Sequence, residues 1–322
     1  MPPSLGWRLH APATVPVACR VLSTVVLLLD VVLPVFAIVL IGAVVGRVFS
    51  LQVQPINKLS LYAVVPALAF RAMAGIEFAE LNVGGLILAF GLFLVAMAIV
   101  GWVLGWRMGT MERRSFIGSI MLGNAANLNL PVALFAFGQA GLDRALILYV
   151  ATALMMYGLG PALFGQAMKP ARILRVVAGF PVLWATLAGL LVNASGVTLP
   201  MAASRAVNLL ADAAIPLMLL ILGIQLVRAG RWQPSGQTWL AISLKLIVAP
   251  LVALGIGSLL GLTGYDLAAV VLLGAMPTAV NTVMLAIEFE GDSQQLGETV
   301  AISTAAAVLT LPIVLMVFAG SL

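Results

Sequence analysis

Long apolar runs, separated by short polar stretches, follow one another along most of the chain. Most runs are close to the roughly 20 residues that a helix needs to cross the hydrocarbon core of a bilayer. Each run is therefore predicted to be a membrane-spanning helix, and the fourth and ninth carry polar residues and a proline in their middle. The predicted spans are 24–46, 57–75, 83–106, 115–138, 144–168, 174–194, 206–228, 238–261, 266–288 and 297–320. The pattern predicts an all-α integral membrane protein with ten transmembrane helices.

The composition strengthens this prediction. Hydrophobic residues make up 63% of the 322 residues and charged residues 8%, whereas soluble domains average about 45–50% and about 25%. The single cysteine, Cys19, and the single histidine, His10, exclude a disulfide framework and a metal centre built on histidine or cysteine. The sequence contains no phosphate-binding loop, dinucleotide fingerprint or catalytic-triad order, which argues against ATP-driven transport by this chain alone and against an enzyme.

The net charge of +5 reflects membrane topology, and nucleic acid is excluded as a partner. Lys and Arg favour the cytoplasmic side of membrane proteins. Ten basic residues flank the gaps after spans 1, 3, 5 and 7, namely Arg47, Lys58, Arg107, Arg113, Arg114, Lys169, Arg172, Arg175, Arg228 and Arg231. Five lie on the opposite side or in the N-terminal segment, namely Arg8, Arg20, Arg71, Arg144 and Arg205. Both termini are therefore predicted to face the periplasm, with the chain in a bacterial inner membrane.

Residues 1–23 precede the first span and are irregular and rich in proline. The apolar run that follows is longer than the usual core of a signal peptide, and it has no clear cleavage site. We interpret these residues as an N-terminal tail, either disordered or the product of an upstream start codon, rather than as a signal peptide.

Prolines recur in the same order in two halves of the chain, residues 24–168 and 169–322. Pro34 is followed eight residues later by a glycine, and so is Pro181. The other matched pairs are Pro66 with Pro216, Pro131 with Pro277, and Pro161 with Pro312. Because five spans per half is an odd number, the second half enters the membrane from the opposite side, as in the inverted repeats of many secondary transporters. Chance matches are the alternative, since proline is common in membrane helices.

The middle of span 4 reads Gly-Asn-Ala-Ala-Asn-Leu-Asn-Leu-Pro, over residues 123–131. Pro131 lacks an N–H and clashes with the carbonyl of Asn127, so the helix is expected to open there. Freed backbone groups cannot face lipid and must line a cavity or pair within the protein. The amides supply donors and acceptors, and the opened helix ends supply partial charges, which together suit an organic anion such as a carboxylate. The alternative is that the asparagines only join neighbouring helices.

Residues 276–282 of span 9, which read Met-Pro-Thr-Ala-Val-Asn-Thr, form the matching break. Two interrupted helices at equivalent places of two inverted halves indicate a substrate site near the bilayer midplane, where these helices would cross. The candidate substrate-binding residues are Asn124, Asn127, Asn129, Pro131, Pro277 and Asn281.

Two charged residues lie deep in the second half, Asp212 in span 7 and Lys245 in span 8. Charges inside a membrane are costly and usually functional. Asp212 is a candidate site for a proton or cation, and Lys245 is a candidate for attracting an anionic substrate. Alternatively the two side chains pair with each other and hold two helices together, a role compatible with the first. No metal site is expected, and no cofactor other than a coupling ion, H⁺ or Na⁺.

Three segments resemble the auxin efflux carrier family, which belongs to the bile acid, arsenite and riboflavin-type transporter superfamily. They are GNAANLNLPVALFAFGQAGLDRA, NLLADAAIPLMLLILGIQL and MPTAVNTVMLAIEFEGD. The first resembles the family's GN-x-x-N-x-x-LP…FG signature, and the likeness covers roughly residues 30–320. Asn281 is typical of the bacterial branch, and the long cytoplasmic loop of many plant carriers is absent.

The resemblance implies two inverted five-helix repeats with crossing broken helices 4 and 9, and elevator-type alternating access. Helices 1, 2, 6 and 7 would form a scaffold, through which a homodimer is implied, and helices 3–5 and 8–10 a transport domain. Asn124 falls where plant carriers have a substrate-contacting asparagine, and Pro131 and Pro277 match the crossover prolines. Asp212 has no plant counterpart that can be placed, so the resemblance does not identify the coupling ion.

These observations favour a secondary transporter for a small organic anion, such as a mono- or dicarboxylate. The alternative is a sodium-coupled symporter of the bile-acid carrier type. A ten-helix drug or metabolite exporter fits the number of helices but lacks the two crossing breaks. A membrane enzyme or a receptor is disfavoured, because the sequence offers neither a catalytic constellation at membrane depth nor a signalling domain.

Overall fold

The computed structural model describes residues 28–49, 51–77, 81–158, 160–164, 171, 174–175, 178–227 and 233–318. Within these residues the secondary structure is helical, with no strand beyond one isolated bridge. In this part of the chain six helices are long and apolar enough to cross a membrane. The chain is a multi-pass membrane protein, as the apolar pattern predicts. The expected N-terminal tail, residues 1–23, lies outside the described residues.

The helices of the first half overlap the predicted spans, but α7 (Asn129–Gly158) runs through the boundary predicted between the fourth and fifth spans. They are the π-helical turn η1 (Leu28–Val32) with α2 (Leu33–Val48), then α3 (Val53–Leu59), η2 (Ser60–Val64) and α4 (Val65–Ala74), then α5 (Val83–Leu104), α6 (Thr110–Met121), α7 (Asn129–Gly158) and α8 (Gly160–Leu163).

The remaining described helices belong to the second half of the chain. They are α10 (Pro181–Ser195) and α11 (Met201–Val227), then α12 (Gly236–Ser243) with the π-helical turn η4 (Leu244–Val248) and α13 (Ala249–Leu259), then α14 (Gly264–Ala275), α15 (Asn281–Glu288) and α16 (Ser293–Phe318).

A π-helical turn precedes a proline at three places. Pro34, Pro66 and Pro250 each occupy the second position of the helix that follows η1, η2 or η4. A proline lacks the N–H that would bond four residues back, and its ring crowds that carbonyl. The wider preceding turn accommodates this crowding while the helix continues. Pro216, in contrast, lies inside α11 without dividing it.

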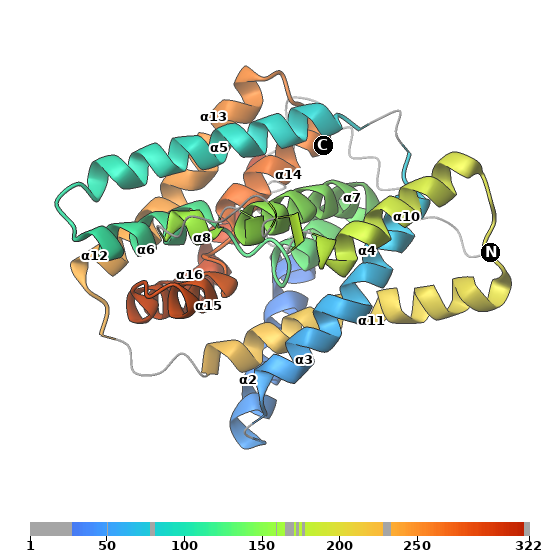
Figure 1. Ribbon diagram of the computed structural model, residues 1–322, viewed down its shortest axis with the longest axis horizontal. Coiled ribbons are helices and arrows are strands. Elements are labelled where there is room, and N and C mark those ends of the chain that lie inside the picture. Colours follow the sequence, from blue (N-terminus) through green and yellow to red (C-terminus); the bar gives the residue numbers. More distant parts are fainter. Residues whose placement is uncertain are drawn as a thin grey trace, which may run out of the picture.

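Helices α2, α4, α10 and α11 pack against one another through glycines, toward the lower right of Figure 1. A side chain at Gly42 of α2 would overlap the backbone of α11, and one at Gly223 of α11 would overlap the backbone of α2. A side chain at Gly189 of α10 would meet the carbonyl of Phe70 in α4. Small residues let membrane helices approach closely. The pairs α2–α11 and α4–α10 therefore form one tightly joined group.

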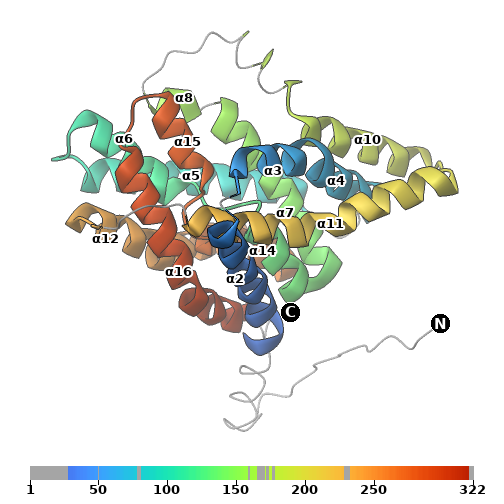
Figure 2. The same ribbon diagram turned by 90° about the horizontal axis from the view of Figure 1, so that it is seen from below.

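A second group consists of α5, α6 and α12 to α16. In it α5 packs on α6 and α13, α16 packs on α6 and α12, and α14 packs on α13 and α7. Figures 1 and 2 both show α6, α12, α15 and α16 at the opposite end of the molecule from α10 and α11, with α7 and α14 between them.

Non-helical segments separate α6 from α7 and α14 from α15, at residues 122–128 and 276–280. The first break lies upstream of Pro131, although the sequence predicts that this proline opens the helix. Pro131 is the third residue of α7, a first-turn position where an N–H has no intrahelical partner to lose. Gly138, with a φ of +65°, divides α7 into a short half-helix and a long one.

The two non-helical segments pair with each other. They run antiparallel and form a bridge between Gly123 and Thr278. The backbone N–H of Asn124 donates to the carbonyl of Pro277 at 2.8 Å. The hydroxyl of Thr278 donates to the carbonyl of Ser119, at the end of α6, also at 2.8 Å. Backbone groups that the helix breaks release are thus paired within the protein, as a membrane environment requires.

Candidate functional site

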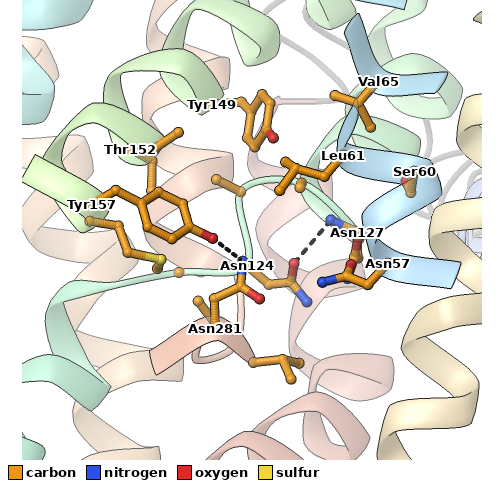
Figure 3. A pocket seen from close by; sticks show the side chains of 17 residues that line it. Asn57, Ser60, Leu61, Val65, Asn124, Asn127, Tyr149, Thr152, Tyr157 and Asn281 are labelled. Carbon is orange, nitrogen blue, oxygen red and sulfur yellow. Dashed lines mark hydrogen bonds between the residues drawn. The ribbon is translucent and has the colours of Figure 1, made fainter. Parts of the chain in front are cut away.

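A pocket of about 60 Å³ lies beside the paired segments (Figure 3). Its wall comes from three places: the two non-helical segments with the start of α15, the C-terminal third of α7, and the junction of α3, η2 and α4. The lining residues are Asn57, Ser60, Leu61, Val65, Gly123, Asn124, Ala125, Ala126, Asn127, Tyr149, Thr152, Ala153, Met156, Tyr157, Ala279, Val280 and Asn281. They include amides, hydroxyls and phenols, but no charged side chain.

Asn124 is held rigidly with one side of its amide free. Its backbone is fixed by Pro277 and by the N–H of Asn129, which donates to the Asn124 carbonyl at 3.1 Å. The side-chain oxygen accepts the N–H of Asn127 at 3.0 Å. The Asn124 Nδ2 is buried and has no hydrogen-bond partner among the described residues. A buried N–H₂ without a partner is costly, so this group is suited to donate to a molecule in the pocket.

Asn281 reaches the pocket from the second half of the chain, as the first residue of α15. Its Nδ2 lies 3.5 Å from the hydroxyl of Tyr157 (Figure 3), the limit of a hydrogen bond. Asn127 also lines the pocket and is half-buried. Amides from both halves of the chain therefore meet around one small space.

Two helix N-termini border the pocket. The short half-helix of α7 begins at Asn129, directly after lining residues 123–127, and α15 begins at the lining residue Asn281. The first N–H groups of both helices already donate to carbonyls just upstream, for example that of Asn129 to Asn124 and that of Val283 to Val280. What these ends add to the pocket is therefore the partial positive charge of the helix dipole. Both ends favour a negatively charged occupant.

Three of the candidate residues do not line the pocket. Asn129 is fully buried, and both polar atoms of its side chain lack a hydrogen-bond partner among the described residues. Pro131 is buried in α7. Pro277 lies in the paired segment and contributes its carbonyl to Asn124. Asn129 and Pro277 support the wall of the pocket, because both bond to the backbone of the lining residue Asn124.

Several lining residues carried no functional prediction. Tyr149, Thr152, Met156 and Tyr157 lie on α7, and their spacing of three, four and one residues places them on one face of that helix. The sequence feature that could have pointed to them is the pair Tyr149 and Tyr157, two tyrosines about two turns apart in an otherwise apolar span. Asn57, on α3, also lines the pocket without a functional prediction from the sequence.

Asp212 lies away from the pocket. Its carboxylate is 68% exposed and pairs with Arg71 of α4, with 2.5 Å between Oδ1 and Nη1. The pairing of Asp212 with Lys245, one of the two alternatives that the sequence leaves open, does not occur. The reason is that α11 packs on α2 and α4, whereas η4 packs in the other helical group.

Lys245 is fully buried in η4. Its ammonium nitrogen lies 5.5 Å from the centre of the Phe93 ring and has no hydrogen-bond partner among the described residues. It does not line the pocket, but it lies immediately behind Gly123, which does.

Comparisons with known proteins agree with this architecture. A family model described as membrane transport protein matches residues 167–315. An uncharacterised transporter of Methanothermobacter thermautotrophicus is 26% identical over 302 residues, which cover 88% of this chain and 96% of the relative. A Rhizobium meliloti protein named "Putative malonate transporter" is 23% identical over 303 residues, covering 87% and 92%. The uncharacterised transporter YfdV of Escherichia coli is 25% identical over 310 residues, covering 87% and 94%.

These relatives match nearly the whole chain and are described as transporters, and none is described as an enzyme. Together with the apolar helices and the paired breaks, they identify the chain as a membrane transporter and not an enzyme. These matches support membership of the chain in the membrane transport protein family, the auxin efflux carrier family that its motifs resemble.

Proposed function

We propose that the chain is a secondary active transporter that carries a small mono- or dicarboxylate across the inner membrane by an elevator movement. The observation that supports this most is the lining of the pocket, which combines the Asn124 amide, two phenols and two helix N-termini with no acidic side chain. Hydrogen-bond donors and positive helix ends stabilise a carboxylate. The name of the Rhizobium relative points to the same class of substrate.

The size of the pocket favours a small anion. A cavity needs about 10–15 Å³ to hold one water, so 60 Å³ corresponds to about four to six waters. A carboxylate with a few carbon atoms is of this size. A bile acid is far larger, which makes the sodium-coupled bile-acid type of carrier the weaker alternative.

The helix contacts support an arrangement of two inverted repeats. The packing of α2 on α11 corresponds to that of α10 on α4, and the packing of α7 on α14 corresponds to that of α16 on α6. Each correspondence exchanges a span of the first half for the equivalent span of the second. An odd number of spans per repeat would invert the second repeat, and the distribution of basic residues favours a periplasmic location for both termini.

The position of the pocket supports an elevator movement. The lining residues Asn57, Ser60, Leu61 and Val65 come from α3, η2 and the start of α4, in the glycine-packed group, which we take as the scaffold. The remaining lining comes from α7, α15 and the paired segments, which we take as part of the moving body. A site at this boundary opens to one side or the other as the body slides past the scaffold.

The test is transport in proteoliposomes with labelled malonate, malate and indole-3-acetate. Asn124→Asp keeps the shape of the side chain but places a negative charge in the pocket, and we expect at least a tenfold loss of carboxylate flux. Asn208→Asp, at an exposed position of α11 outside the pocket, is the matched control. Equal flux in parent and Asn124→Asp would show that the site is misassigned. Flux that depends on sodium would favour the bile-acid type of carrier.

A further inference from the structure

Lys245 is a buried cation for which the described residues provide no anion. Its exposed fraction is 0%, and its nitrogen has no hydrogen-bond partner there. The ion pairs among these residues are Arg71 with Asp212 and Arg144 with Asp266, and neither includes it. Its nitrogen lies over the face of the Phe93 ring, 5.5 Å from the ring centre.

The nitrogen of Lys245 lies directly behind the wall of the pocket. A Cβ added to Gly123 would be 3.3 Å from the Lys245 nitrogen and 3.0 Å from the carbonyl oxygen of Leu273. Gly123 itself lines the pocket, and Lys245 does not. One backbone residue without a side chain is therefore all that separates the lysine from an occupant of the pocket at this point.

No charged group of the surrounding helices neutralises Lys245. The turn η4 packs against α6, α12, α13, α14 and α16. The titratable or charged groups on these elements are Glu112, Arg113, Arg114, Tyr265, Asp266 and Glu298. The first three lie in the first turn of α6, and Tyr265 and Asp266 in that of α14. Glu298 accepts the backbone N–H of Gln233.

We propose that Lys245 couples the transport of the anion to the movement of one proton. The amine takes a proton from water on the loading side as the anion enters, and it returns the proton to water on the other side as the anion leaves. The inference rests on the proposed function. It adds the coupling ion and the residue that binds it.

The proton and the anion are coupled because the ammonium of Lys245 and the carboxylate of the bound anion stabilise each other when both are buried. A buried ammonium without a counter-charge is strongly disfavoured, and a carboxylate across Gly123 supplies that counter-charge. At a separation of roughly 7 Å and an effective dielectric constant of about 20, the attraction changes an equilibrium constant roughly fifty-fold. When the moving body is loaded, the bound carboxylate compensates the charge of Lys245. When the body is empty, the lysine is neutral. In both states the body crosses the membrane without the cost of an uncompensated lysine charge.

An acidic hollow lies beside the start of α12, the helix that leads into the turn carrying Lys245. A second pocket, of about 710 Å³, is lined by Glu112, Asp292, Glu298 and the buried amide of Gln295, which has no hydrogen-bond partner among the described residues. Thr238 also lines it. Lys245 follows Thr238 by seven residues on the same helix, which is two turns, or about 10 Å, along one face. We assign proton entry on this side of the membrane to this hollow.

The first experiment compares proton-driven accumulation with exchange in proteoliposomes. In the parent, an inward proton gradient should drive accumulation of labelled malonate. In Lys245→Met, exchange of malonate for malonate should persist with an affinity lowered roughly fifty-fold, while the gradient no longer drives accumulation. Lys58→Met, at an exposed lysine of α3, is the matched control and should behave as the parent. Gradient-driven accumulation that survives in Lys245→Met overturns the inference.

The second experiment counts protons on binding. Malonate added to purified protein in weakly buffered detergent should remove about one proton per site from solution in the parent, and none in Lys245→Met. Lys245→Arg, which stays protonated, should bind malonate without proton uptake and decides the question if the methionine variant does not fold. Proton uptake equal to the parent's in either variant refutes the assignment. A parent that neither binds nor carries any carboxylate refutes the proposed function instead.

Discussion

The ion pair between Arg144 of α7 and Asp266 of α14 holds together two helices from different halves of the chain. Its atoms are 2.5 Å apart, and the two side chains are only 6% and 12% exposed. The second carboxylate oxygen of Asp266 accepts the N–H of Asn82 at 3.2 Å, and Arg144 also donates to the carbonyl of Ala140 at 3.0 Å. Removing one member leaves the other charge buried without its partner, which costs about 3–5 kcal/mol.

The effects of removing the two charges on the free energy of unfolding are therefore expected to be strongly non-additive. Arg144→Met and Asp266→Leu should each lower the free energy of unfolding by about 3–5 kcal/mol, whereas the double variant should recover most of that loss. Unfolding of the purified protein by a graded denaturing detergent measures all four states of the cycle. Arg205→Met, at an exposed arginine of α11, controls for loss of a positive charge. A double variant as unstable as the sum of the two single variants would refute the reasoning.

Two further predictions concern helix packing and coupling. Gly223→Val should push α11 away from α2, because the new side chain would overlap the Val39 backbone, and should lower the free energy of unfolding by about 1–3 kcal/mol or more. The melting temperature measures this loss, and Gly255→Val, in open space on α13, is the control and should have little effect. Asp212→Asn should leave proton-driven malonate accumulation unchanged, because this exposed carboxylate pairs with Arg71 away from the pocket. Loss of accumulation in Asp212→Asn would transfer the coupling role from Lys245 to Asp212.

Much of the helical framework could be predicted from the sequence. Residues 83–106 were expected to form a helix that the structure places at Val83–Leu104, and residues 206–228 correspond to Met201–Val227. Such runs predict helices because a helix is the structure in which a single segment of about twenty apolar residues pairs its own backbone groups while it crosses a bilayer. The sequence predicts the position of the first helix break less accurately. This position depends on the pairing of residues 122–128 with a segment far along the chain, and not on Pro131 alone.

The pocket shows what local sequence cannot determine. Asn124 and Asn127 line it, while Asn129, two residues further, is buried behind it. In a non-helical segment the direction of each side chain depends on its tertiary partners, so periodicity gives no guidance. Tyr157 and Asn57 come from other helices and could be placed there only once the packing of those helices was known. The same holds for the Arg71–Asp212 pair across α4 and α11.

The antiparallel contact between Gly123 and Thr278 has a consequence for how the chain matures during synthesis. When the ribosome has released the first half, the exposed amides and carbonyls around Asn124 have no complement, because Pro277 and Ala279 have not yet been made. Hydrocarbon cannot satisfy them, so this stretch must wait in water, in the insertion machinery or against a temporary partner. Completion of the fold is thus delayed until Ala279 has been made, whatever the order in which the flanking helices insert.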